Sequence, residues 1–185
     1  MIGSMQLVES DNCAAAHTQA GESILQRLKS NCEEGRSILL LISGGSSMGV
    51  VVQALSQLTD EELAHITVSQ VNERFVEAGS EDSHWQQFVQ TFGGIEALHE
   101  AIPILSTGKN LSETVNNYDL ELTKQIQKAD YTLAVCGVGV DGSIAGMHPT
   151  DGVTFQLFLS DDVAVGLRGS AVSYTHLTLP TTYGV

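Results

Sequence analysis

The segment Ser43-Gly44-Gly45-Ser46-Ser47 has the residue types of an anion-binding turn. It directly follows an apolar run and precedes a stretch of helical periodicity. Glycines let the backbone turn tightly and approach a ligand closely, while serine hydroxyls and the amides at a helix N-terminus donate hydrogen bonds to an anion. We expect the first four of these residues to bind substrate. An ordinary strand-to-helix turn is the alternative.

Arg74 is the second candidate for anion binding. It lies in the segment Asn72-Glu73-Arg74-Phe75, which follows a run rich in β-branched residues, and it is one of only eight Lys and Arg residues in the chain. A guanidinium fork matches the oxygens of a phosphate or a carboxylate. The alternative is a surface ion pair between Arg74 and Glu73.

A second glycine-rich segment, 137–143, reads Gly-Val-Gly-Val-Asp-Gly-Ser. Its glycines, among them Gly139 and Gly142, predict a second backbone cradle for the ligand. We expect the side chains of Asp141 and Ser143 to project into the same crevice. In an open parallel sheet, ligands bind beyond the carboxyl ends of the strands, so the three segments are expected to meet there.

The same segment also matches the dinucleotide-binding pattern G-x-G-x-x-G. Asp161 or Asp162 follows at the spacing of about 20 residues that this pattern requires. Two observations disfavour a nucleotide. Asp141 would place a carboxylate beside the pyrophosphate, and the segment comes late in the chain and not after its first strand.

The elements that must position these segments alternate between strand-like and helix-like patterns. Strands are predicted at 37–42, 66–71, 102–105, 131–136 and 162–167, the first and fourth of them buried. Helices are predicted at 14–32, 46–58, 85–92, 94–100 and 112–128, the last capped by Ser112. The run Thr59-Asp60-Glu61-Glu62 predicts a capping box. This alternation predicts one α/β domain of three layers, α/β/α, with a mainly parallel sheet.

Charge limits the classes of partner. The 185 residues include 22 acidic side chains and a net charge of −14, which repels the phosphate backbone of nucleic acids. The apolar runs are too short to cross a bilayer, and no signal-like stretch opens the chain. The three cysteines, Cys13, Cys32 and Cys136, lack a metal-binding spacing. We therefore expect a cytoplasmic protein with reduced thiols that binds neither nucleic acid nor membrane.

The order of the three segments resembles a known family. Ser-Gly-Gly-Ser after the first strand, Glu-Arg-Phe after the second and Gly-x-Gly-x-Asp-Gly after a later strand are similar to the 6-phosphogluconolactonases of the glucosamine-6-phosphate isomerase/6-phosphogluconolactonase family. The resemblance implies a Rossmann-like sheet, here truncated at its C-terminus. It also implies hydrolysis of 6-phosphogluconolactone to 6-phosphogluconate in the pentose phosphate pathway, with no metal or cofactor. The partner would be a small phosphorylated sugar or lactone.

The chain departs from that family at the residues expected to do chemistry. The resemblance implies a histidine as the base that activates water, but Ser143 stands at that position. Asn72 replaces the usual aspartate, and His84 replaces the usual asparagine. A serine hydroxyl does not accept a proton at neutral pH without a neighbouring base.

We therefore take Asp141, Ser143 and His148 as the catalytic candidates, with His84 as a displaced base. A phosphosugar-binding paralogue impaired in catalysis and a deaminase-isomerase of amino-sugar phosphates remain alternatives.

The last residues, 172–185, have a second explanation. The run Val-Ser-Tyr-Thr-His-Leu-Thr-Leu-Pro-Thr at 172–181 is what one reading frame of a common sequencing adapter encodes. We expect the native phosphosugar-binding domain to comprise residues 1–171 and the remainder to be an artefact. A genuine strand is the competing interpretation.

Overall fold

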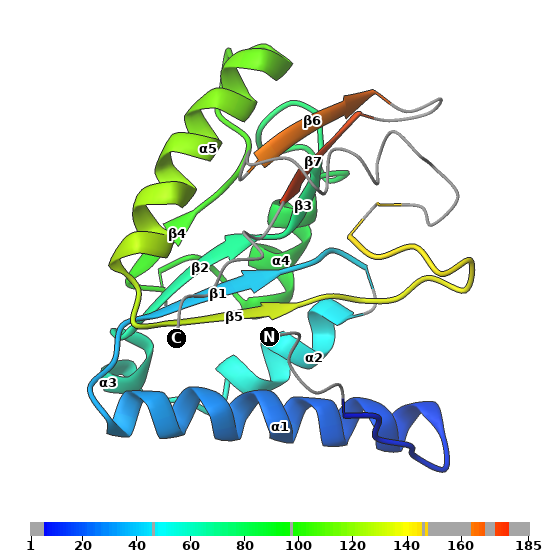
Figure 1. The fold of residues 1–185 in the computed structure, drawn as a ribbon, viewed down its shortest axis with the longest axis vertical. Helices are drawn as coiled ribbons and strands as arrows, with labels where there is room; N and C mark the ends of the chain where they lie inside the picture. Colours follow the sequence, from blue (N-terminus) through cyan, green and yellow to red (C-terminus); the bar gives the residue numbers. More distant parts are fainter. Residues whose placement is uncertain are drawn as a thin grey trace.

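A four-stranded parallel sheet forms the centre of the computed structural model, which describes residues 6–45, 47–96, 98–145, 147, 164–168 and 173–177. The strand order is β4-β2-β1-β5. The strands are β1 (Ile38–Ile42), β2 (Ile66–Gln70), β4 (Glu100–Ile102) and β5 (Tyr131–Val135). Ile42 pairs with Gln70 on one side and with Val135 on the other, so these strands end at one edge (Figure 1). The predicted three-layer α/β fold is confirmed.

One face of the sheet is covered by the helices α1 (Cys13–Glu33), α2 (Ser47–Leu55), α3 (Asp60–Leu63) and α4 (His84–Phe92). Alternate residues of β1, namely Ile38, Leu40 and Ile42, pack into this core with Leu28 of α1 and Phe88 of α4. All five residues of β1 are buried because helices cover both faces of the strand.

The helix α5 (Leu111–Lys128) covers the opposite face, where Leu39 and Leu41 of β1 meet Leu122 (Figure 1). The buried hydroxyl of Tyr118 donates a hydrogen bond of 2.6 Å to the carbonyl of Gln70 at the end of β2. Burial raises the pKa of the Tyr118 hydroxyl, which therefore stays protonated across the neutral range.

A second, smaller sheet has the order β3-β7-β6, from β3 (Asn72–Arg74), β7 (Ser173–Leu177) and β6 (Ala164–Arg168). Both of its pairings are antiparallel. Only Val71 separates β3 from β2, so the chain passes directly from the central sheet into the small one. Strand formation at 173–177 does not identify the origin of that segment, because Ser-Tyr-Thr-His-Leu suits a strand whatever encodes it.

Several predicted elements differ in the structure. Residues 94–96 and 98–99 form bends and a turn and not a helix, and the strand predicted at 102–105 lies earlier, at Glu100–Ile102. The strand predicted as buried at 131–136 is half-exposed along β5, which is the last strand in the order of the central sheet. Asn110 and not Ser112 caps α5, in a capping box with Glu113.

The predicted capping box at 59–62 is confirmed. Thr59 and Glu62 form the capping box of α3. All three cysteines have free thiols. Within the described residues, no helix is both long and apolar enough to cross a membrane.

Candidate functional site

The first glycine-serine turn lies at the carboxyl end of β1, against the end of β5. Ser43 is buried, and its hydroxyl accepts a hydrogen bond of 3.0 Å from the backbone N–H of Gly137. The hydroxyl of Ser47, at the start of α2, lies 3.0 Å from that of Ser43. One serine hydroxyl therefore joins the turn after β1 to the glycine-rich segment after β5.

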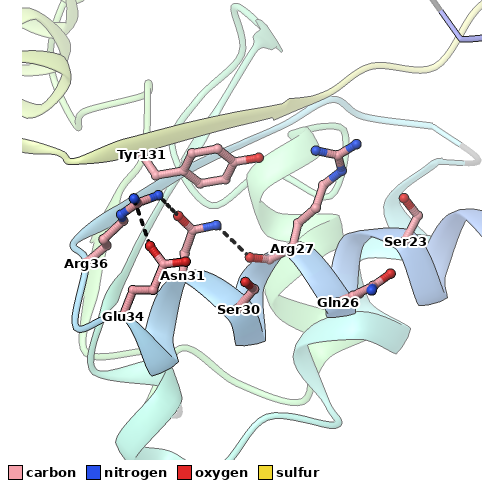
Figure 2. Close-up of a pocket in the computed structure, with 8 residues that line it drawn as sticks. All are labelled: Ser23, Gln26, Arg27, Ser30, Asn31, Glu34, Arg36 and Tyr131. Atoms are coloured by element: carbon pink, nitrogen blue, oxygen red, sulfur yellow. Dashed lines mark hydrogen bonds and ion pairs between the residues drawn. The ribbon is translucent and has the colours of Figure 1, made fainter.

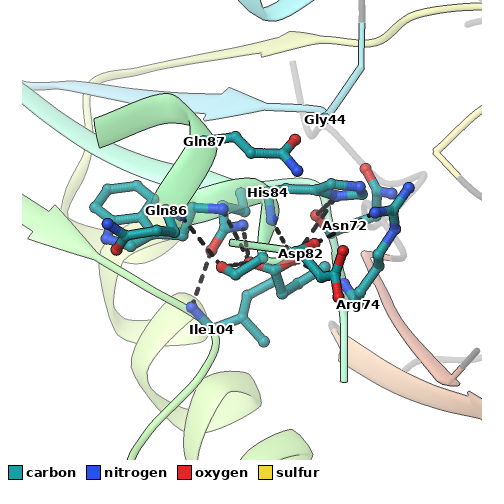
Figure 3. A network of polar contacts seen from close by, with 12 residues as sticks. Gly44, Asn72, Arg74, Asp82, His84, Gln86, Gln87 and Ile104 are labelled. Atoms are coloured by element: carbon teal, nitrogen blue, oxygen red, sulfur yellow. Dashed lines mark hydrogen bonds and ion pairs between the residues drawn. The ribbon is translucent and has the colours of Figure 1, made fainter. Parts of the chain in front are cut away.

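Gly44 is in close contact with a histidine from α4. A Cβ at this position would overlap the imidazole ring of His84. The turn therefore needs glycine here for space, whereas Gly45 has a φ of +83°, a left-handed conformation that favours glycine. Figure 3 shows Gly44 above the network of polar contacts that contains His84.

Glu73 lies at the centre of this network and is fully buried. Its carboxylate accepts five hydrogen bonds, at 2.7–3.0 Å. The donors are the backbone N–H groups of Arg74, His84 and Trp85, the Ser83 hydroxyl and the Gln70 side-chain amide. Glu73 is therefore a buried clamp between β3 and the start of α4, and the alternative of a surface ion pair with Arg74 is wrong.

The backbone N–H of Arg74 is bound to Glu73, whereas its guanidinium group has a different environment. Among the residues that the structure describes, its guanidinium makes one long hydrogen bond, 3.4 Å from Nη1 to the carbonyl of Asp82. Figure 3 shows its guanidinium group extending towards the side of the network where Gly44 and His84 lie. An anion at that place would replace one weak contact with charge-assisted hydrogen bonds.

Asn72 carries an unsatisfied acceptor in the same place. Its side chain is buried, and its Oδ1 has no hydrogen-bond partner within the described part of the chain. Leaving such a buried acceptor unpaired costs about 1–3 kcal/mol. The backbone carbonyl of Asn72 lies 3.3 Å from Nδ1 of His84.

The segment 137–143 folds back on itself. Val138 and Ile144 form an antiparallel bridge, and Gly139 N–H donates to the carbonyl of Ser143 at 2.7 Å. The carboxylate of Asp141 accepts hydrogen bonds from the backbone N–H and the hydroxyl of Ser143, at 3.0 and 2.7 Å. Residues 137–145 contain no helix, so the G-x-G-x-x-G pattern lacks the helix N-terminus that would bind a pyrophosphate.

The predicted site residues fall into three groups. Ser43, Gly44 and Gly45 are consecutive in the turn after β1. Gly44 contacts His84, whose ring lies 3.3 Å from the carbonyl of Asn72 on β3, the strand that also carries Arg74. Gly139, Asp141, Gly142 and Ser143 form the turn just described, with Gly142 at a φ of +80°. Ser46 and His148 lie outside the described residues.

A different hollow, of about 400 Å³, lies between α1 and the start of β5 (Figure 2). Arg27, Arg36 and Tyr131 line it. Arg36 is already paired with Glu34 at 2.7 Å and with Asn31 at 3.1 Å. This hollow lies at the amino end of β5, opposite the edge where parallel sheets bind ligands.

No metal-binding cluster of three or more His, Cys, Asp or Glu side chains occurs among the described residues. The polar groups of the candidate site are mainly backbone amides, hydroxyls, one carboxamide and one guanidinium group. Such donors suit phosphate and hydroxyl groups.

Comparison with known proteins gives one family and several similar structures. Residues 11–171 match the family model described as glucosamine-6-phosphate isomerases/6-phosphogluconolactonase. No curated protein sequence matches the chain.

Three similar solved structures bear the name 6-phosphogluconolactonase. That of Shewanella baltica OS155 has a TM-score of 0.75 and 17% identity, over 91% of this chain and 72% of the other. That of Thermotoga maritima has a TM-score of 0.66 and 16% identity, over 86% and 73%. That of Leishmania guyanensis has a TM-score of 0.66 and 16% identity, over 91% and 74%. At these identities the similarity shows a shared fold.

Proposed function

Because this chain belongs to the glucosamine-6-phosphate isomerase/6-phosphogluconolactonase family, we propose that it hydrolyses 6-phosphogluconolactone to 6-phosphogluconate. The substrate would be a small phosphorylated sugar lactone, and the reaction would belong to the pentose phosphate pathway of the cytoplasm. The turn at Ser43, Gly44 and Gly45 would bind the substrate together with Arg74.

The observation that carries this proposal is the meeting of three segments at one edge of the sheet. The Ser43 hydroxyl binds the N–H of Gly137, and Gly44 contacts His84, which lies 3.3 Å from the carbonyl of Asn72. Arg74 follows Asn72 by two residues on β3. In a chain of net charge −14, a phosphate is held best by backbone amides and one placed guanidinium group.

The test measures hydrolysis and binding on one preparation. We expect lactone hydrolysis above the spontaneous rate, and binding of 6-phosphogluconate by calorimetry. Arg74→Ala should weaken that binding by about 10- to 100-fold, the equivalent of a charge-assisted hydrogen bond. Arg36→Ala is the matched control, because Arg36 lies at the far end of the sheet and should leave binding unchanged. Equal binding by both variants would contradict the placement of the phosphate.

A second candidate is a phosphosugar-binding protein without hydrolysis. The observation that favours it is the hydrogen bond from the Ser143 hydroxyl to Asp141, since neither group is an imidazole base. Binding of 6-phosphogluconate without turnover, together with activity gained on Ser143→His, would select this candidate. Turnover of glucosamine 6-phosphate instead would select a deaminase-isomerase.

We also propose that the native phosphosugar-binding sequence in this chain comprises residues 1–171 and that residues 172–185 come from a sequencing adapter. In support, the family model matches up to residue 171. The coding nucleotides test the idea directly. Codons that differ from the adapter sequence would overturn it.

A further inference from the structure

His84 has one ring nitrogen that is free to accept a proton, as its contacts within the described residues show. Nδ1 of His84 lies 3.3 Å from the carbonyl oxygen of Asn72, so Nδ1 carries the proton and donates it there. In that tautomer Nε2 is an acceptor, and no hydrogen bond to Nε2 occurs among the described residues.

The surroundings of His84 fix the position of its ring. Gly44 packs against the ring so closely that no Cβ fits. The ring is about a tenth exposed, and Oε1 of the buried Glu73 lies 3.8 Å from Nδ1. The other charged residues of this network are Arg74 and Asp82, and the Arg74 guanidinium donates to the backbone carbonyl of Asp82 at 3.4 Å.

We propose that Nε2 of His84 is the proton acceptor of this site and deprotonates the attacking water. This inference rests on the proposed lactone hydrolysis. A water molecule that donates one O–H to His84 Nε2 satisfies this acceptor. Its lone pair is then free to attack a carbonyl carbon.

The reaction balances without any further reactant. The water oxygen forms a bond to the lactone carbonyl carbon while its proton passes to Nε2. The tetrahedral intermediate then breaks the bond between this carbon and the ring oxygen. The ring oxygen leaves with the electron pair and takes the proton back from the imidazolium. The product is the open-chain hydroxy acid, and His84 is neutral again.

The test compares His84→Asn with His65→Asn. His65 lies at the start of β2, outside the site, so its variant is the matched control. We expect kcat to fall by about 100-fold or more in His84→Asn, the usual contribution of a general base. Affinity for 6-phosphogluconate should be retained, and His65→Asn should behave like the wild type.

Each other outcome has one meaning. Wild-type turnover in His84→Asn would overturn the inference and leave the proposed hydrolysis intact. A wild-type protein that binds 6-phosphogluconate but does not hydrolyse the lactone would overturn the proposed function itself. If His84→Asn loses its fold or its affinity, His84→Ala with added imidazole decides: rescued turnover supports a proton acceptor, and no rescue overturns it.

Discussion

Replacing Glu73 with glutamine should be among the most damaging conservative changes in this chain. The substitution keeps the shape of the side chain but turns one oxygen into an NH₂ group that faces donors. Oε1 accepts from two donors and Oε2 from three. Whichever oxygen becomes the NH₂ group, at least two donors lose their acceptor, and each loss costs about 1–3 kcal/mol of stability. We expect Glu73→Gln to lower the free energy of unfolding by about 2–6 kcal/mol, a large part of the usual 5–15 kcal/mol.

The assay is urea unfolding followed by the fluorescence of Trp85, the single tryptophan. The backbone N–H of Trp85 donates a hydrogen bond of 3.0 Å to Glu73, so the fluorescence of this residue reports on the surroundings of the Glu73 carboxylate. Glu77→Gln is the matched control, because Glu77 is exposed and lies four residues further along. Its effect should stay within about 0.5 kcal/mol.

The reasoning is refuted if the Glu73→Gln variant unfolds at the wild-type urea concentration with an unchanged slope. That result would mean that the five donors find other acceptors at no cost. A changed slope would indicate instead that the native or denatured state differs in compactness.

Four further substitutions test other parts of the fold. In thermal unfolding, Gly44→Ala should destabilise the protein by about 1–3 kcal/mol, because the added methyl group overpacks against the imidazole of His84. In the same assay, Gly49→Ala should stabilise the protein by about 0.5–1 kcal/mol, because a Cβ at this position of α2 meets open space. Tyr118→Phe should lower the free energy of urea unfolding by about 1–3 kcal/mol, because it removes the donor of a buried hydrogen bond. The N–H and hydroxyl of Ser37 hold the pKa of Asp130 below its ordinary value of 3.8. This interaction stabilises the fold above that value and is lost as the pH falls through the lower, folded-state pKa, so Asp130→Asn should flatten the acid side of the stability curve, measured by thermal unfolding against pH.

The central sheet was predictable because its signals are local. The run at 38–42 is wholly apolar, and the run at 66–70 begins with Ile, Thr and Val, residues that favour strands. Chain order then places the ends of β1 and β5 at one edge, which is why the turn at Ser43 and the segment at 137–143 could be assigned to the same side of the sheet.

The contacts inside the site were not predictable from local pattern. A glutamate beside an arginine in sequence suggests an ion pair, yet Glu73 turns inward and accepts from donors up to 12 residues away. The orphaned acceptor of Asn72 and the packing of Gly44 on His84 depend on how β3 meets α4. Likewise, an apolar sequence cannot show that β5 is the last strand in the sheet order and therefore half-exposed.

The shared hydroxyl of Ser43 has a consequence for how affinity arises. Since it bonds Gly137 while lying beside Ser47, motion of either turn disturbs the other. When one ligand fragment orders the first turn, the second turn is partly ordered as well. A second fragment that binds there therefore loses less conformational entropy. Inorganic phosphate and an unphosphorylated sugar acid, each weak alone, would then strengthen one another's binding, and the intact molecule would gain more than the sum of its two ends.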